Sequence, residues 1–122
     1  MLLFVATTKT TQIKKSATMN LKKPNECTSL DEVRIEIDKI DHQIIQLFSE
    51  RMKYVEAVVS YKNDEEGIIA EDRKNHVIHE RSKWAKEAGL DPSTIEQMYT
   101  LLIEHNIRHE MELLKTQKNE NQ

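Results

Sequence analysis

Two basic residues stand where their spacing gives them chemical significance. Between Ser29 and Asn63 the apolar residues recur at steps of three and four, the period of a helix that packs along one side. Arg51 falls inside this apolar stripe, where a cation without an anion is strongly unfavourable. Lys62 follows eleven residues later, about 16 Å along a helix and nearly in phase. The pair has the geometry to hold the two ends of one small anion.

Arg34 lies on a neighbouring stripe, seventeen residues before Arg51, a rise of about 25 Å. That distance is too long for both residues to reach one site from the same helix, so a functional Arg34 would have to serve a site in another subunit. Purely structural roles remain open for each residue. Arg34 could form an ion pair with Asp38 at i,i+4, and Glu110 could neutralise Arg51. Lys62 could be a residue of a helix C-terminus, where the helix dipole favours a positive charge.

The segments that must position these side chains are predicted to be helical. The 122 residues include only two glycines and two prolines, and about a third of them are charged, which indicates one all-α domain. Ser29 and Glu32 fit a capping box, and no glycine or proline follows until Gly67. The first helix is therefore about 34 residues, roughly 50 Å long. Such a length in a small chain favours packing against a partner chain or within a helical bundle.

The rest of the chain reads as a loop over residues 63–69 and two further helices. The second helix is predicted over residues 71–88, with Gly89 as its C′ residue. Asp91 is the expected N-cap of the third helix, which runs to about Lys115. The apolar face of that helix contains two polar residues one turn apart, Asn106 and Glu110.

The two ends of the chain lack this periodicity. We expect residues 1–22 to be a disordered N-terminal tail, residues 23–116 to be one helical domain, and residues 117–122 to be a frayed C-terminal tail. The net charge of −3 gives no reason to expect nucleic acid, and no segment approaches a membrane-spanning length. The single cysteine, Cys27, is compatible with a cytoplasmic location.

No sequence motif points to a metal or a covalent nucleophile. His105 and His109 have a spacing that can bind a metal, but no further ligand is placed to complete a site. We interpret them as surface residues. No glycine-rich phosphate loop and no nucleophile paired with a base stand out either. We therefore predict a protein without a metal or cofactor.

In the types and order of its candidate residues, the sequence resembles the all-α (type II) chorismate mutase family. The resemblance is closest to the isochorismate-pyruvate lyase branch of that family, which feeds salicylate synthesis. The resemblance covers about residues 22–115. It is carried by Cys27-Thr-Ser-Leu-x-x-x-Arg34-x-x-Ile-Asp-x-Ile-Asp41, Arg51-Met-x-Tyr-Val55, Tyr61-Lys62, Arg73 and Arg81-x-x-Trp84-Ala-x-x-x-Gly89-Leu. It implies an intertwined homodimer of three-helix chains, with two active sites that each draw residues from both subunits.

The resemblance also implies roles for individual residues. Arg34 corresponds to the arginine lent across the dimer, and Arg51 and Arg73 to the residues that bind the substrate carboxylates. The remaining matches concern the ether oxygen and its surroundings. Lys62 resembles the lysine that bonds this oxygen, Glu110 stands where many members carry Gln and some Glu, and Asn106 is a neighbour in the pocket. The loop over residues 63–69 resembles the segment that closes over the site.

The implied chemistry explains why cations are needed and a nucleophile is not. Chorismate and isochorismate are dicarboxylates, which fixed guanidinium groups bind well. The rearrangement is pericyclic, so catalysis consists of positioning and electrostatic stabilisation. We expect a chorismate mutase that forms prephenate. The alternatives are an isochorismate-pyruvate lyase using the same pocket and a non-catalytic helical dimerisation module, whose signature would be loss of Arg51 or Lys62.

Overall fold

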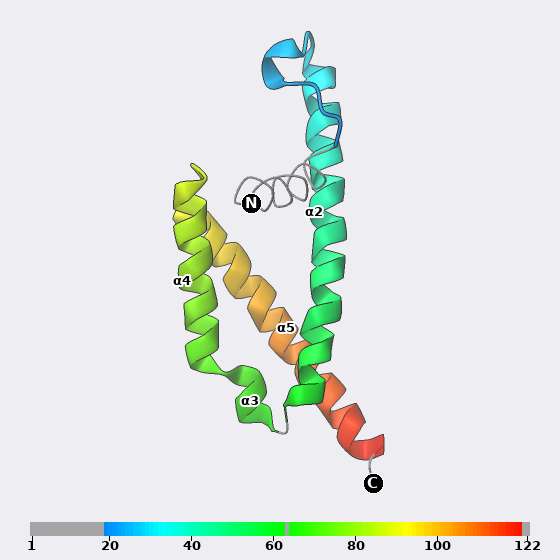
Figure 1. The fold of residues 1–122 in the computed structure, drawn as a ribbon, viewed down its shortest axis with the longest axis vertical. Helices are drawn as coiled ribbons and strands as arrows, with labels where there is room; N and C mark the ends of the chain where they lie inside the picture. Colours follow the sequence, from blue (N-terminus) through cyan, green and yellow to red (C-terminus); the bar gives the residue numbers. More distant parts are fainter. Residues whose placement is uncertain (1–18, 63, 121–122) are drawn as a thin grey trace, which may run out of the picture. The chain divides into compact units, whose positions relative to one another are not determined.

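The protein is described here from a computed structural model that covers residues 19–62 and 64–120. These residues form helices and connecting turns, with no strand among them, so the predicted all-α class is confirmed. The elements are labelled in Figure 1. In chain order they are η1 (Pro24–Glu26), α2 (Leu30–Val58), η2 (Val59–Tyr61), α3 (Glu65–Ile69), α4 (Glu71–Glu87) and α5 (Pro92–Glu120).

Contacts within the chain define two compact units, a first unit of residues up to 49 and a second unit of residues from 50 onward. Helix α2 contributes residues to both units. In the first unit, the backbone N–H of Glu32 donates to Ser29 Oγ at 3.1 Å, which confirms Ser29 as the cap of α2. The Glu32 carboxylate accepts hydrogen bonds from the backbone and hydroxyl of Thr28 instead of from Ser29. The Thr28 backbone donor, helped by the Lys22 ammonium group 3.0 Å away, lowers the pKa of Glu32 to about 2. Lys22, at the end of the predicted tail, is thus bonded to α2.

The long first helix does not bury its apolar stripe within this chain. We expected the stripe to form a packed seam, but no residue of α2 is buried. The helix also ends earlier than predicted, because the chain tightens into η2 after Val58. A 3₁₀ turn at the end of a long helix redirects the chain, and here it places Lys62 at the C-cap of η2.

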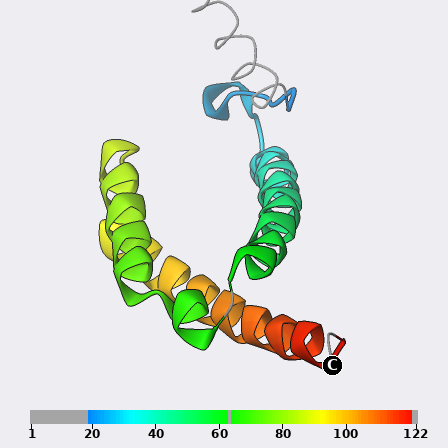
Figure 2. The same cartoon turned by 60° about the horizontal axis from the view of Figure 1, so that its bottom comes forward.

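In the second unit, α4 and α5 form a helical hairpin and pack against each other (Figures 1 and 2). Gly89 has a φ of +79°, and the Leu90 backbone N–H donates to Ala85 O at 2.8 Å, as predicted for a glycine-terminated helix. The Asp91 carboxylate accepts bonds from the backbone and hydroxyl of Thr94, at 3.0 and 2.6 Å, which confirms the N-cap of α5. The helix continues to Glu120, beyond the predicted end near Lys115.

The predicted loop over residues 63–69 contains a helical turn, α3. The carboxylate of Asp64 caps α3 by accepting a hydrogen bond from the Gly67 backbone N–H at 2.8 Å. Ile68 is buried against Val59 and Leu114, and burial of one such side chain contributes about 1.5–3 kcal/mol. Cap and burial together outweigh the low helix propensity of the glycine. Three partly buried apolar residues complete this cluster: Ile107, Met111 and Leu113.

No helix of the described segments combines the length and the apolar character needed to cross a membrane.

Ala70, which joins α3 to α4, has a left-handed backbone conformation, with a φ of +36°. For a residue with a Cβ this conformation costs roughly 1–2 kcal/mol, whereas glycine loses roughly 0.5–1 kcal/mol through the entropy of the unfolded chain. We expect Ala70→Gly to raise the free energy of unfolding by about 0.5 kcal/mol. Ala88→Gly, at an ordinary φ of −88°, is the control and should lower it. Urea unfolding at one protein concentration would compare them; an equal loss in both variants would contradict the expectation.

Candidate active site

A cavity of about 470 Å³ lies within the second unit. This volume is in the range of small-molecule sites. Its walls come from the last turns of α2, from α3 and from the facing sides of α4 and α5. Five residues selected from the sequence line this cavity together: Arg51, Lys62, Arg73, Asn106 and Glu110. Its apolar lining includes Val55, Val58, Ile68, Val77, Ile103 and Ile107.

Arg51 projects from α2 toward α5 and is bonded to a residue far away in the sequence. Its Nη1 atom donates to Asn106 Oδ1 at 2.6 Å. Burial lowers the pKa of Arg51, and the nearby positive charge of Arg81 lowers it further, while Tyr99 and Glu110 act in the opposite direction. An arginine keeps its charge at neutral pH despite such a shift. The cavity therefore contains a partly desolvated cation whose one described hydrogen-bond partner is a neutral amide.

Asn106 is 4% exposed, and its amide nitrogen Nδ2 has no hydrogen-bond partner among the described residues. A buried donor left without an acceptor costs about 1–3 kcal/mol. Because Asn106 lines the cavity, an acceptor atom of a bound molecule can satisfy this donor. The buried face of α5 thus presents a donor to the same space that Arg51 lines.

Glu110 follows one helical turn after Asn106 and is 7% exposed. Burial raises the pKa of Glu110, although the positive charges of Lys62, Arg51 and His109 oppose the rise. The ion pairs found in residues 19–62 and 64–120 do not include one between Glu110 and Arg51. A carboxyl group in this setting holds its proton more readily than an exposed one and can act as a hydrogen-bond donor.

Lys62 reaches the cavity from the C-cap of η2, and its side chain lies against α3. A Cβ atom added to Gly67 would lie 3.2 Å from Lys62 Cδ, closer than an ordinary van der Waals contact. Gly67 therefore leaves the room that the lysine side chain occupies. The backbone N–H of the same glycine donates to the Asp64 carboxylate that caps α3. Gly67 therefore supports both the cap of the short helix and the position of the Lys62 side chain.

Two cations in the cavity wall were not selected from the sequence. Lys74 and Arg81, both on α4, line the cavity beside Arg73. A signal for Arg81 was present, because Arg73, Val77 and Arg81 are spaced four apart and share one face of a helix. In the sequence, Arg81 stands out only as part of the motif that resembles the family. Arg34 lies on α2 in the first unit, is exposed and is not among the cavity-lining residues.

The fold and this cavity define an all-α protein with a cation-rich cavity between its helices. A family model for chorismate mutase type II matches residues 33–111, well over half of the chain. The chain belongs to the chorismate mutase type II family.

Two curated relatives show how the chain compares with named enzymes. Isochorismate pyruvate lyase of Pseudomonas aeruginosa is 39% identical over 83 residues, which cover 68% of this chain and 82% of the relative. Chorismate mutase of Methanocaldococcus jannaschii is 31% identical over 93 residues, covering 75% of this chain and 94% of the relative.

Proposed function

We propose that this protein is an enzyme that converts chorismate to prephenate. The observation that carries the proposal is the set of cations in one cavity. Arg51, Lys62 and Arg73 line it together, and none of the three forms an ion pair with a carboxylate in the part of the chain that the structure describes. Three cations in one cavity wall, with the single carboxyl group of Glu110 among the lining residues, favour an anionic ligand. Chorismate, a dicarboxylate, supplies two negative charges.

The proposed roles follow from the donors that each residue offers. Arg51 and Arg73 bind the two carboxylates, because guanidinium groups match carboxylates in shape and charge. Lys62 and a protonated Glu110 donate to the ether oxygen, on which negative charge grows as its bond to carbon breaks. The free Nδ2 donor of Asn106 contacts a further substrate oxygen. These contacts favour the compact conformer and the polar transition state, and the protein forms no covalent bond.

A second candidate is an isochorismate-pyruvate lyase, which splits isochorismate into salicylate and pyruvate. The relative with 39% identity carries that name, and its substrate is also a dicarboxylate bridged by an ether oxygen. The same cations therefore serve either reaction. A non-catalytic dimerisation module is the remaining alternative; its expected signature was loss of Arg51 or Lys62, and both residues are present in the cavity wall.

The decisive experiment is incubation of the purified protein with each substrate in turn. We expect prephenate to form from chorismate, and Lys62→Met to reduce that rate strongly. Salicylate and pyruvate formed from isochorismate at a higher kcat/KM would establish the lyase as the main activity. Absence of turnover with both substrates would favour the dimerisation module. The proposal places the enzyme in the cytoplasm, as predicted from its sequence.

We also propose that the active protein is a homodimer. Between residues 30 and 47, α2 leaves large apolar side chains 36–65% exposed. An amphipathic helix obtains most of its stability by packing its apolar face, and within one chain this face is left uncovered. A second copy of the chain offers a matching apolar helix. The exposed side chains are Leu30, Val33, Ile35, Ile37, Ile40, Ile44, Ile45 and Leu47.

A shared active site predicts complementation between two inactive variants. Arg34→Ala removes the arginine proposed to reach the partner's site, and Lys62→Ala disables the cavity of its own chain. When the two are mixed and subunits exchange, one site of each heterodimer contains neither change. We expect a heterodimer to recover about half of the wild-type activity, since one of two sites is intact. Subunit exchange without recovery would show that Arg34 serves its own chain or no site.

A further inference from the structure

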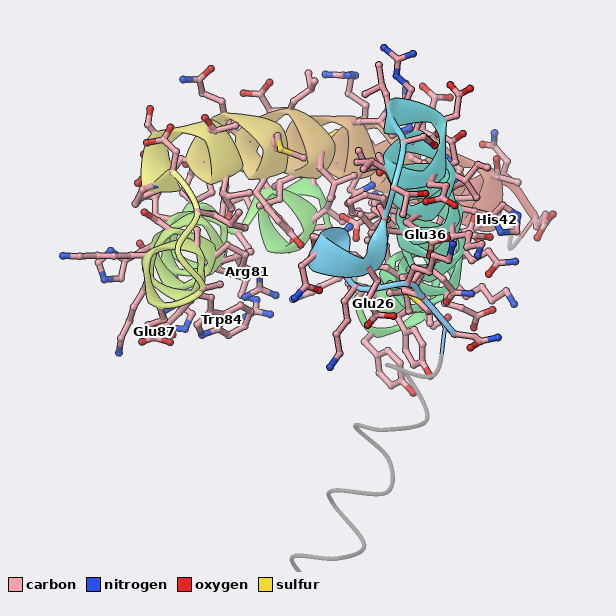
Figure 3. The ribbon with its side chains drawn as sticks, turned by 90° about the horizontal axis from the view of Figure 1, so that it is seen from above. Glu26, Glu36, His42, Arg81, Trp84 and Glu87 are labelled. Atoms are coloured by element: carbon pink, nitrogen blue, oxygen red, sulfur yellow. The ribbon has the colours of Figure 1, made fainter. Side chains whose placement is uncertain are left out.

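Arg81 is a cation in the cavity wall whose orientation is set by two aromatic rings. Its guanidinium carbon lies 4.6 Å from the centroid of the Trp84 ring and 5.8 Å from that of Tyr99. Arg81 and Trp84 lie side by side on α4 in Figure 3, whereas Tyr99 belongs to α5. Both distances are within the range of cation–π attraction. The side chain is thus held in one place at the junction of two helices.

The attraction of the guanidinium group to the two rings is electrostatic and uses none of its N–H donors in a hydrogen bond, so the donors at its edge stay available. The five N–H donors of arginine point outward from that edge. The hydrogen bonds and ion pairs found in residues 19–62 and 64–120 include none made by the Arg81 guanidinium group. Its positive charge also acts on Arg51, whose pKa it lowers, so the two cations are near each other in the same cavity. An anion placed between them would relieve this repulsion.

We propose that Arg81 is a further substrate-binding residue, whose guanidinium edge binds an anionic oxygen of the substrate while Trp84 and Tyr99 position it. The inference rests on the proposed function for the identity of the ligand as a cyclic dicarboxylate. It adds a cation of α4 to Arg51 and Arg73, the two arginines of this cavity to which the resemblance gave a role. The competing role is structural, in which Arg81 only ties α4 to α5 through the two rings.

The test compares Arg81→Met with Lys83→Met. Methionine keeps the length of the side chain and can still cover Trp84, but it removes the charge. Lys83 lies on the same helix, is exposed and does not line the cavity, so its replacement is a matched control for the lost charge. We expect Arg81→Met to raise KM at least about tenfold, the size of a lost charge-assisted hydrogen bond, with a smaller change in kcat. Arg81→Lys should recover part of the affinity, and Lys83→Met should match the wild type.

A binding measurement keeps the inference testable even without turnover. Trp84 is the only tryptophan of the chain, so its fluorescence reports directly on the ring beside Arg81. Titration with prephenate, a dicarboxylate, should change this fluorescence in the wild type and give a Kd at least about tenfold weaker in Arg81→Met. An active enzyme with unchanged KM and Kd in Arg81→Met would overturn the role of Arg81 alone. Weaker prephenate binding in Arg81→Met, in a protein that turns over neither substrate, would support Arg81 and reject the proposed activity.

The positioning role of the rings has its own readout. If Trp84 acts through Arg81, Trp84→Leu should raise KM in the wild-type background and have little effect when Arg81 is already methionine. Thermal unfolding of the wild type, Arg81→Met, Trp84→Leu and the double variant distinguishes this positioning role from a purely structural contact. Additive effects on KM, or a loss of stability in Arg81→Met with an unchanged KM, would show that the contact only joins the two helices.

Discussion

Replacement of Arg51 by alanine is expected to reduce kcat/KM at least about a hundredfold while changing the free energy of unfolding by about 1 kcal/mol or less. The catalytic loss follows from removal of a fixed cation opposite a substrate carboxylate. The small effect on stability has two opposing causes. Asn106 loses the donor that bonds its Oδ1 atom at 2.6 Å, but the cavity also loses a partly desolvated cation that is repelled by Arg81.

The matched control for this prediction is Arg108→Ala. Arg108 is exposed on α5 and does not line the cavity, so the same change of residue should leave both kcat/KM and stability close to those of the wild type. Steady-state kinetics and urea unfolding at one protein concentration provide the two measurements. If Arg51→Ala instead loses several kcal/mol of stability, Arg51 is a structural residue of the core and its assignment to the site is wrong.

Glu110→Gln is expected to remove a pH dependence that the wild type shows. If Glu110 donates to the ether oxygen, its protonated form is the active one, and kcat/KM falls as pH rises through the pKa of this carboxyl group. Burial raises that pKa above the ordinary value of 4.5, which extends the active range toward neutral pH. Glutamine is a donor at every pH, so the variant should show a flattened profile between about pH 4.5 and pH 8.5.

The same shift predicts the sign of an effect on stability. The folded protein holds the Glu110 proton more tightly than the unfolded chain, so wild-type stability falls as pH rises from about 4.5 through the raised pKa. Glu110→Gln avoids this loss and should become more stable than the wild type on the alkaline side of that window. Glu112 is exposed on the same helix, so Glu112→Gln is the control. It should change neither the pH profile of kcat/KM nor the pH dependence of stability. Identical pH profiles in wild type and Glu110→Gln would remove Glu110 from the mechanism.

Sequence alone determined the features that depend on neighbouring residues. The caps at Ser29 and Asp91 and the left-handed Gly89 were predicted and are present, because each is decided by hydrogen bonds within a few residues. The polar pair of α5 was also visible, since two polar residues in an apolar helical face stand out by spacing. Both are buried, as expected for residues that face a core or a ligand.

Tertiary packing decided the features that depend on residues far apart in the chain. Helix propensity favoured a loop before Ala70, but burial of Ile68 against η2 and α5 stabilises α3 there. Spacing offered Glu110 as the partner of Arg51, whereas the structure pairs Arg51 with Asn106, fifty-five positions away. Arg81 lines the cavity beside α5 because α4 packs on α5, which also brings its guanidinium group near one ring from each helix. Periodicity shows which side of a helix is buried, but the partner of each side chain depends on how separate helices pack, and that is a property of the folded chain.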